Sequence, residues 1–166
     1  MIFVVCGVSG AGKTTVGRLL AQRIDARFVD ADDYHPPANV EKMRRGEPLE
    51  DGDREPWLTR LADLLDDLRS NGDDAVLACS ALKRAHRERL GIDQREIVSV
   101  FLGGGADLIM ERISRRDHEF MPPELLASQF EALEPPAGGI CVSIEGEPEE
   151  VTDSILRQLG QSGVDR

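Results

Sequence analysis

Short apolar runs recur along the chain and are rich in β-branched residues. They cover residues 2–6, 27–30, 75–79, 97–102 and 140–144. Apolar and polar positions do not alternate within these runs. This pattern is typical of strands that are buried on both faces of a parallel sheet. The sequence therefore predicts five buried strands.

Helical patterns separate these runs. They cover residues 13–24, 56–70, 82–90, 106–116 and 148–159, with a shorter helix, "NVEKMRR", that ends before Gly46. Alternation of strands and helices at this spacing indicates an α/β fold with three layers. We expect one domain over residues 1–166, built on a central parallel five-stranded sheet that is flanked by helices.

Two segments interrupt the alternation. Residues 31–55 are rich in Pro, Gly and Asp, and residues 117–123, "DHEFMPP", separate two helical stretches. Long irregular insertions in a compact domain more often serve function than decoration. The sequence predicts a substrate cap at 31–55 and a lid at 116–123.

Composition narrows the functional classes. The net charge of −11 argues against a nucleic-acid partner, because binding to phosphate backbones relies on Lys and Arg. The N-terminal run "MIFVVCG" lacks a positive region and is too short for a signal peptide or a membrane span. Three cysteines without a CxxC pair indicate reduced thiols and a cytoplasmic protein. We expect each cysteine to pack within a buried strand.

Residues 7–14, "GVSGAGKT", match the pattern GxxxxGK[ST] in full. An apolar strand precedes the motif and an amphipathic helix follows it, which is the context that a phosphate-binding loop requires. Lys13 can reach the β- and γ-phosphates, and the Thr14 hydroxyl can bind Mg²⁺. The expected nucleotide-binding residues are Gly7, Gly10, Ala11, Gly12, Lys13, Thr14 and Thr15.

Mg²⁺ normally needs a carboxylate as well, and "VDADD" at the end of the second strand is the nearest supply. In an extended segment Asp30 and Asp32 point to the same side and Asp33 points away. One of the same-side pair would hold the metal through water, and the other would accept a hydroxyl proton. For Asp33 a solvated or capping role is the better interpretation.

Four stretches together resemble the gluconate kinases of the shikimate-kinase-like P-loop group. They are "GVSGAGKTT", "FVDADDYHPPANVEKMRRGEPLEDGDREPWL", "ACSALKRAHRERL" and "LLASQFEALEPP", and the match runs from about residue 2 to 160. The resemblance implies a P-loop kinase fold and ATP-dependent phosphorylation of D-gluconate to 6-phosphogluconate, with Mg²⁺. It also implies a homodimer.

The resemblance assigns roles to single residues. Asp32 would bind the substrate hydroxyl and act as base, and Asp30 would hold the metal through water. Arg54 would bind the substrate carboxylate with its planar guanidinium, although pairing with Asp51 or Asp53 is the structural alternative. Ser80 and Lys83 would contact substrate or phosphate; a helix cap and a surface lysine are equally compatible readings.

The lid residues follow from the same resemblance. Arg112 would stack on adenine, and Arg116 would reach the transferring phosphoryl group as an arginine finger does. A solvated helix end is the alternative for both arginines. His118 would contact substrate from the lid, or else lie in solvent.

The chain departs from the family pattern at Ala31, where relatives usually have Gly, and at His86, where they usually have Tyr. Glu119 replaces a residue of the lid or lengthens it by one. These departures leave the phosphate chemistry intact and bear on the lid. The triple glycine at 103–105 follows the fourth strand and is expected to mark a tight turn into a helix.

Two alternatives remain open on the residues alone. One is a kinase for shikimate or another small polyol acid, which would share the phosphate loop and the paired aspartates. The other is a non-catalytic switch that binds ATP and has no acceptor. Asp32 and Arg54 argue against the switch, because it needs neither a base nor a carboxylate clamp.

Overall fold

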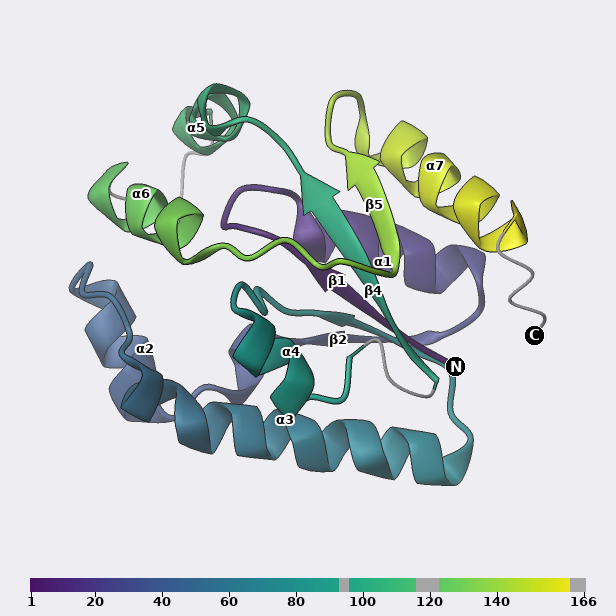
Figure 1. The fold of residues 1–166 in the computed structure, drawn as a ribbon, viewed down its shortest axis with the longest axis horizontal. Coiled ribbons are helices and arrows are strands. Elements are labelled where there is room, and N and C mark those ends of the chain that lie inside the picture. The colour runs from purple at the N-terminus through teal and green to yellow at the C-terminus, as the bar shows by residue number, and fades with distance from the viewer. Residues whose placement is uncertain (93–95, 116–122, 162–166) are drawn as a thin grey trace.

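The computed structural model describes residues 1–92, 96–115 and 123–161. Its centre is a sheet of five parallel strands in the order β2-β3-β1-β4-β5 (Figure 1). The strands are β1 (Ile2–Cys6), β2 (Arg27–Asp30), β3 (Ala75–Ala78), β4 (Ile97–Gly103) and β5 (Ile140–Ser143). Each begins at the residue that the apolar pattern predicts, so the predicted sheet is confirmed.

The helices also follow the predicted order. They are α1 (Lys13–Arg23), α2 (Pro37–Arg44), α3 (Asp51–Asn71), α4 (Arg84–Arg89), α5 (Ala106–Ser114), α6 (Pro123–Ala132) and α7 (Pro148–Gln161), with a 3-10 helix η1 (Ala31–Tyr34). The predicted start of α3 at residue 56 is wrong. The helix begins at Asp51 because Glu50 and Asp53 form a capping box, and Pro56 lies within its second turn.

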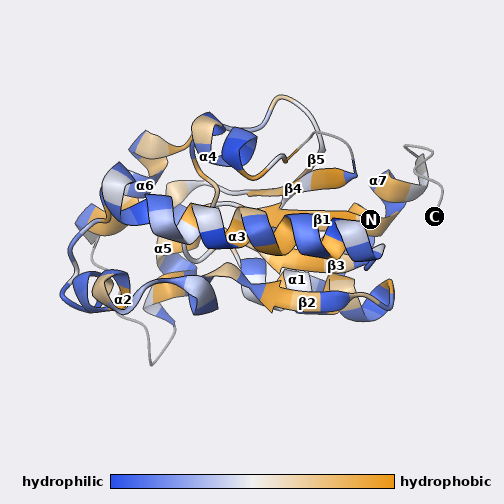
Figure 2. Ribbon diagram, turned by 90° about the horizontal axis from the view of Figure 1, so that it is seen from below, coloured by the Kyte–Doolittle hydropathy of each residue, from blue (hydrophilic) through white to orange (hydrophobic). Residues whose placement is uncertain are grey.

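Two apolar layers enclose the sheet. Phe3 and Val5 of β1 face a cluster that includes residues of α1, α5 and α7, whereas Ile2, Val4 and Cys6 face a cluster that includes α3. Figure 2 shows the hydrophobic strands behind α3, which carries both hydrophilic and hydrophobic residues. This arrangement is the predicted three-layer α/β fold.

The edge strand β5 differs from the prediction. Ile140 and Val142 are buried, while Cys141 and Ser143 are exposed. The expectation of a buried Cys141 is therefore wrong, because an edge strand packs its inner face on the core and leaves the other face in water. Cys6 and Cys79 are buried as expected.

The carboxyl ends of β1, β3 and β2 lie side by side and carry the segments of chemical interest. The Gly7 N–H donates to the Ser80 carbonyl over 3.3 Å, which joins the loop after β1 to the loop after β3. Gly103 ends β4 and Gly105 caps α5, so the triple glycine forms the expected strand-to-helix turn.

None of the helices in the described ranges has the length and apolar character needed to cross a membrane.

Candidate active site

The phosphate loop depends on glycine backbones. Gly12 caps α1 with φ 94°, and Gly10 has φ 81°; both angles lie in the left-handed region that side chains disfavour. A Cβ on Gly10 would lie 2.6 Å from Cγ1 of Ile113 in α5. Lys13 Nζ donates to the Val8 carbonyl over 3.1 Å, so its side chain folds back across the loop.

Helix α6 also holds the phosphate loop. The Ser9 backbone N–H donates to Gln129 Oε1 over 2.7 Å, and Gln129 Nε2 donates to the Ser9 hydroxyl over 3.0 Å. The stretch "LLASQFEALEPP" contributes to the family resemblance, but no role for Gln129 was predicted from it. A polar residue among the apolar positions of this stretch was the signal that could have found it.

Burial and two nearby carboxylates have opposite effects on the pKa of Lys13. Burial lowers the pKa of its ammonium, and Asp32 and Asp30 act in the opposite direction. Burial raises the pKa of the nearby Cys79 thiol to about 12, so this side chain stays a neutral thiol at neutral pH. Asp30 and Asp32 therefore lie close enough to Lys13 to favour its charged form.

The side chains of Thr14 and Asp30 lie side by side at the end of the phosphate loop. The Thr14 hydroxyl donates to Asp30 Oδ2 over 2.9 Å. Mg²⁺ prefers oxygen ligands and keeps several waters, so it uses few protein side chains when phosphates share the coordination. A hydroxyl at the start of α1 beside a carboxylate at the end of β2 has the donor chemistry for such an ion.

The aspartate segment is not extended as we expected. Residues 31–34 form η1, and Asp30 caps this short helix by accepting a hydrogen bond from the Asp32 N–H over 3.1 Å. The capping role considered for Asp33 thus belongs to Asp30, whose β-region backbone suits a cap. Asp33 is exposed and lines a pocket of about 420 Å³ with Asp30 and Tyr34.

Arg54 lies in a group of cationic and polar side chains around Asp51. Its guanidinium donates to the Leu49 carbonyl over 2.6 Å and lies 3.8 Å from Asp51 Oδ1. Lys83 Nζ donates to the same Asp51 oxygen over 2.8 Å, and His86 Nε2 lies 3.9 Å from it. The structure thus shows the Arg54–Asp51 pairing that the sequence analysis kept as an alternative. It also shows that Arg54, Lys83 and His86 all lie around this carboxylate.

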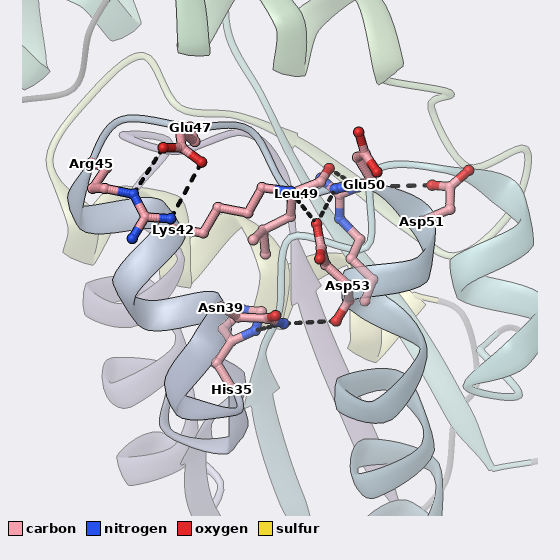
Figure 3. Close-up of polar contacts among 10 residues, drawn as sticks. His35, Asn39, Lys42, Arg45, Glu47, Leu49, Glu50, Asp51 and Asp53 are labelled. Atoms are coloured by element: carbon pink, nitrogen blue, oxygen red, sulfur yellow. Dashed lines mark hydrogen bonds and ion pairs between the residues drawn. The ribbon is translucent and has the colours of Figure 1, made fainter.

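The segment between η1 and α3 is fixed by buried polar contacts that the sequence analysis did not find. The Trp57 indole N–H donates to the Ala31 carbonyl over 2.7 Å, and the His35 ring stacks on Trp57 with centroids 4.4 Å apart. Asn39 donates to the Asp53 carbonyl over 2.8 Å (Figure 3). Lys42 donates to the Asp53 carboxylate over 2.7 Å. The stretch "FVDADDYHPPANVEKMRRGEPLEDGDREPWL" contains all of these residues, but its pattern gives no indication that they contact one another.

Ser80 does not cap α4, which was the alternative to its role as a substrate contact. Lys83 is the N-cap residue of α4, and its side chain makes no capping hydrogen bond. Glu134 instead accepts a hydrogen bond from the Arg84 N–H over 2.5 Å. Ser80 is half-buried beside the phosphate loop.

Arg112 lies near the end of α5 and binds the loop between β5 and α7. Its guanidinium donates to the carbonyls of Ile144 and Gly146, the latter over 3.0 Å. The Arg112 guanidinium therefore lies against that loop, which differs from the alternative of a solvated helix end. Arg116, His118 and Glu119 lie outside the described residues.

Comparisons with known proteins agree with this geometry. The shikimate kinase family model matches residues 9–159. The chain is 46% identical over 159 residues to the gluconokinase of Gluconobacter oxydans (strain 621H), which covers 94% of this chain and 89% of that protein. A gluconokinase crystal structure from Sinorhizobium meliloti 1021 superposes with a TM-score of 0.86 at 37% identity, over 98% of this chain and 93% of the other.

An unliganded sugar kinase from Janibacter sp. HTCC2649 superposes equally well, with a TM-score of 0.86 at 39% identity, over 96% of this chain and 92% of the other. The family model spans the aspartates after β2 and the segment around Arg54, and both superposed structures cover nearly the whole chain. The chain belongs to the gluconokinases, within the shikimate kinase family.

Proposed function

We propose that the chain transfers the γ-phosphoryl group of ATP to D-gluconate, giving ADP and 6-phospho-D-gluconate. One observation supports this proposal most directly: the Thr14 hydroxyl of the phosphate loop donates to Asp30 Oδ2, and Asp30 Oδ1 accepts from the Asp32 N–H, so the carboxylate proposed to bind the substrate hydroxyl belongs to a segment held against the phosphate loop. A nucleotide switch would need no such carboxylate.

In the proposed reaction a hydroxyl oxygen of gluconate attacks the γ-phosphorus, and the bond from that phosphorus to the bridging oxygen of ADP breaks. Asp32 binds the hydroxyl and takes its proton. Lys13 and the N–H groups of Gly10 and Gly12 neutralise charge on the phosphates. Positioning and electrostatics carry most of the catalysis in phosphoryl transfer, which suits a site without a strong nucleophile of its own.

Thr14 and Asp30 would hold Mg²⁺, Thr14 directly and Asp30 through water. The ion supplies charge neutralisation and alignment of the phosphate oxygens when it is bound. The hydrogen bond between the two side chains supports this assignment, because it places both oxygens at the end of the phosphate loop.

Arg54 would bind the gluconate carboxylate, helped by Lys83. The Asp51 carboxylate already lies against both cations, and a substrate carboxylate offers the same chemistry to them. Ser80 and His118 as substrate contacts, Arg112 on adenine and Arg116 on the phosphoryl group stay predictions. The homodimer, the cytoplasmic location, and the division into cap and lid also stay predictions.

The experiment measures ADP release from ATP and Mg²⁺ with D-gluconate, with shikimate and without acceptor, for the unaltered chain and for Asp32→Asn. We expect gluconate-dependent turnover that falls by a factor on the order of 10² to 10⁴ in the variant, while the Kd for ATP stays unchanged. Turnover with shikimate alone would favour the polyol-acid alternative. Equal ADP release with and without every acceptor would contradict the proposal.

A further inference from the structure

His35 lies between the two groups that would hold the ends of the substrate. Its side chain is 5% exposed, and its ring stacks on Trp57 with the planes 10° apart. It follows η1, which carries Asp32, and precedes α2, whose Asn39 lies beside Asp53 in the first turn of α3 (Figure 3).

The contacts of Asn39 fix which nitrogen of His35 carries the proton. Asn39 Nδ2 donates to the Asp53 carbonyl over 2.8 Å, and an oxygen in this position could not do so. The orientation of the amide is therefore determined. The same Nδ2 lies 3.3 Å from Nδ1 of His35. An amide nitrogen cannot accept a hydrogen bond, so His35 Nδ1 must be the acceptor and the ring hydrogen is on Nε2.

The remaining N–H group of the ring faces Asp32. His35 Nε2 lies 3.9 Å from Asp32 Oδ1, and the Asp32 side chain is 84% exposed. Burial, together with the charge of Arg54, lowers the pKa of His35 to about 4, so the ring is neutral at pH 7 and has a single N–H to offer. This distance is longer than a hydrogen bond, so the carboxylate would have to rotate about its side-chain torsions to accept from Nε2.

The Nδ1 side of the ring is connected through Asn39 to the backbone of Arg54. The Asp53 carbonyl that accepts from Asn39 belongs to the peptide bond whose nitrogen is that of Arg54. This peptide is held from its second side as well, because the Arg54 N–H donates to the Glu50 carbonyl over 3.2 Å. The contacts from His35 through Asn39 to Asp53 therefore connect η1 with the backbone that carries Arg54.

We propose that His35 is a positioning residue for the phosphoryl acceptor: its Nε2–H orients the Asp32 carboxylate, and its contact with Asn39 fixes that carboxylate relative to Arg54. This inference rests on the proposed function, in which Asp32 binds the hydroxyl and Arg54 the carboxylate of one sugar acid. The spacing between these two contacts then selects acids whose hydroxyl and carboxylate groups are separated by the length of gluconate. His35 acts through Asp32 and does not itself touch the substrate.

The first test observes the tautomer directly. Long-range ¹H–¹⁵N spectra of the unaltered chain at pH 7 resolve the ring nitrogens of its three histidines, and His35→Gln identifies the signals of His35. We expect a neutral ring with the hydrogen on Nε2, and a shift of the Nε2 signal in Asp32→Asn. A hydrogen on Nδ1, or an imidazolium, would overturn the proposal whatever the activity of the protein.

The second test uses two variants that separate stacking from hydrogen bonding. His35→Phe keeps an aromatic ring against Trp57 and loses both nitrogens, whereas the amide nitrogen of His35→Gln reaches the place of Nε2. We expect kcat with gluconate to fall on the order of tenfold to a hundredfold in His35→Phe, with the KM for ATP unchanged. His35→Gln should recover most of this loss. Met43→Leu, at an exposed position of α2, is the control and should match the unaltered chain.

The outcomes distinguish this inference from the proposed function. If the unaltered chain shows no gluconate-dependent turnover, the proposed function fails and the spectra still decide the tautomer. If the unaltered chain turns over gluconate and His35→Phe has the same kcat, the function stands and the positioning role is refuted. Equal losses in the Phe and Gln variants, in proportion to lower Tm values, would reduce His35 to a structural residue.

Discussion

The phosphate loop, residues 7–14, and the predicted substrate-cap segment, residues 31–55, are built in different ways. The loop uses backbone groups, three glycines with positive φ and packing of α5 against Gly10. The cap segment uses side chains from η1, α2 and α3 that contact one another, such as Trp57 with Ala31 and Lys42 with Asp53.

The difference follows from the ligands that the two regions would hold. Phosphate oxygens are matched by converging N–H groups and a helix N-terminus, which a short contiguous motif supplies. A sugar acid presents hydroxyls and a carboxylate some distance apart, so its recognition needs side chains from separate elements at a fixed spacing. The loop is consequently defined by local sequence, and the cap by tertiary contacts.

The largest effect should come from the phosphate loop. Lys13→Met removes the cation that neutralises the β- and γ-phosphates, and we expect kcat to fall by about 10³-fold. Arg23→Met, at the far end of the same helix, is the control and should leave kcat unchanged. Steady-state ADP release measures both. A loss below tenfold in Lys13→Met would contradict the role of this lysine.

Gly10→Ala tests whether the loop backbone is as constrained as its φ angle and its contact with Ile113 indicate. We expect the free energy of unfolding to fall by about 2–4 kcal/mol, because the side chain is strained at this φ and overlaps Ile113. Gly52→Ala is the matched control, since no atom lies within 4 Å of its Cβ. Urea denaturation compares the two, and equal stabilities would show that the loop tolerates a side chain.

Arg54→Lys tests the cap. A lysine keeps the charge but cannot form the bidentate contact to a carboxylate, so we expect the KM for gluconate to rise by roughly tenfold to a hundredfold. The KM for ATP should not change. Arg60→Lys, one to two turns further along α3, is the control. An unchanged KM for gluconate would place the carboxylate elsewhere.

The smallest effect concerns acid. Burial, followed by the charge of Arg54, lowers the pKa of His35 to about 4 and lowers that of His86. Between pH 6.5, near the pKa of an unfolded histidine, and the folded pKa of His35, the unfolded chain binds more protons than the folded chain. The contribution of these histidines to the free energy of unfolding is therefore fully present above pH 6.5 and is lost as the pH falls toward 4. Tm measured from pH 7 to 5 should decline less steeply in His35→Gln. Parallel declines would show that His35 does not contribute.

The sequence predicted the fold well because its signals are local. Apolar runs marked every strand, and helix patterns marked the intervening elements. The predictions were wrong where a local contact changed the expected structure. The capping box of Glu50 and Asp53 makes α3 begin before the predicted residue, and η1 forms after Asp30 where an extended segment was expected. The exposed Cys141 reflects the position of β5 at the edge of the sheet, which a single run cannot indicate.

The candidate site divides in the same way. The motif indicated Lys13 and Thr14, and the structure joins Thr14 to Asp30 at the end of β2 by a hydrogen bond. Gln129 on Ser9 and the contacts of His35 with Trp57 and Asn39 were missed, because each joins residues whose separation in sequence carries no periodic signal.

The sequence by itself determined the strand order along the chain, the phosphate loop and the family, because apolar periodicity and a contiguous motif act over a few residues. Tertiary structure alone decided that Arg54, Lys83 and His86 lie around Asp51, and that Nε2 of His35 lies 3.9 Å from Asp32 Oδ1. Those relations depend on how η1, α2, α3 and α4 pack, and packing brings together groups that the chain keeps apart.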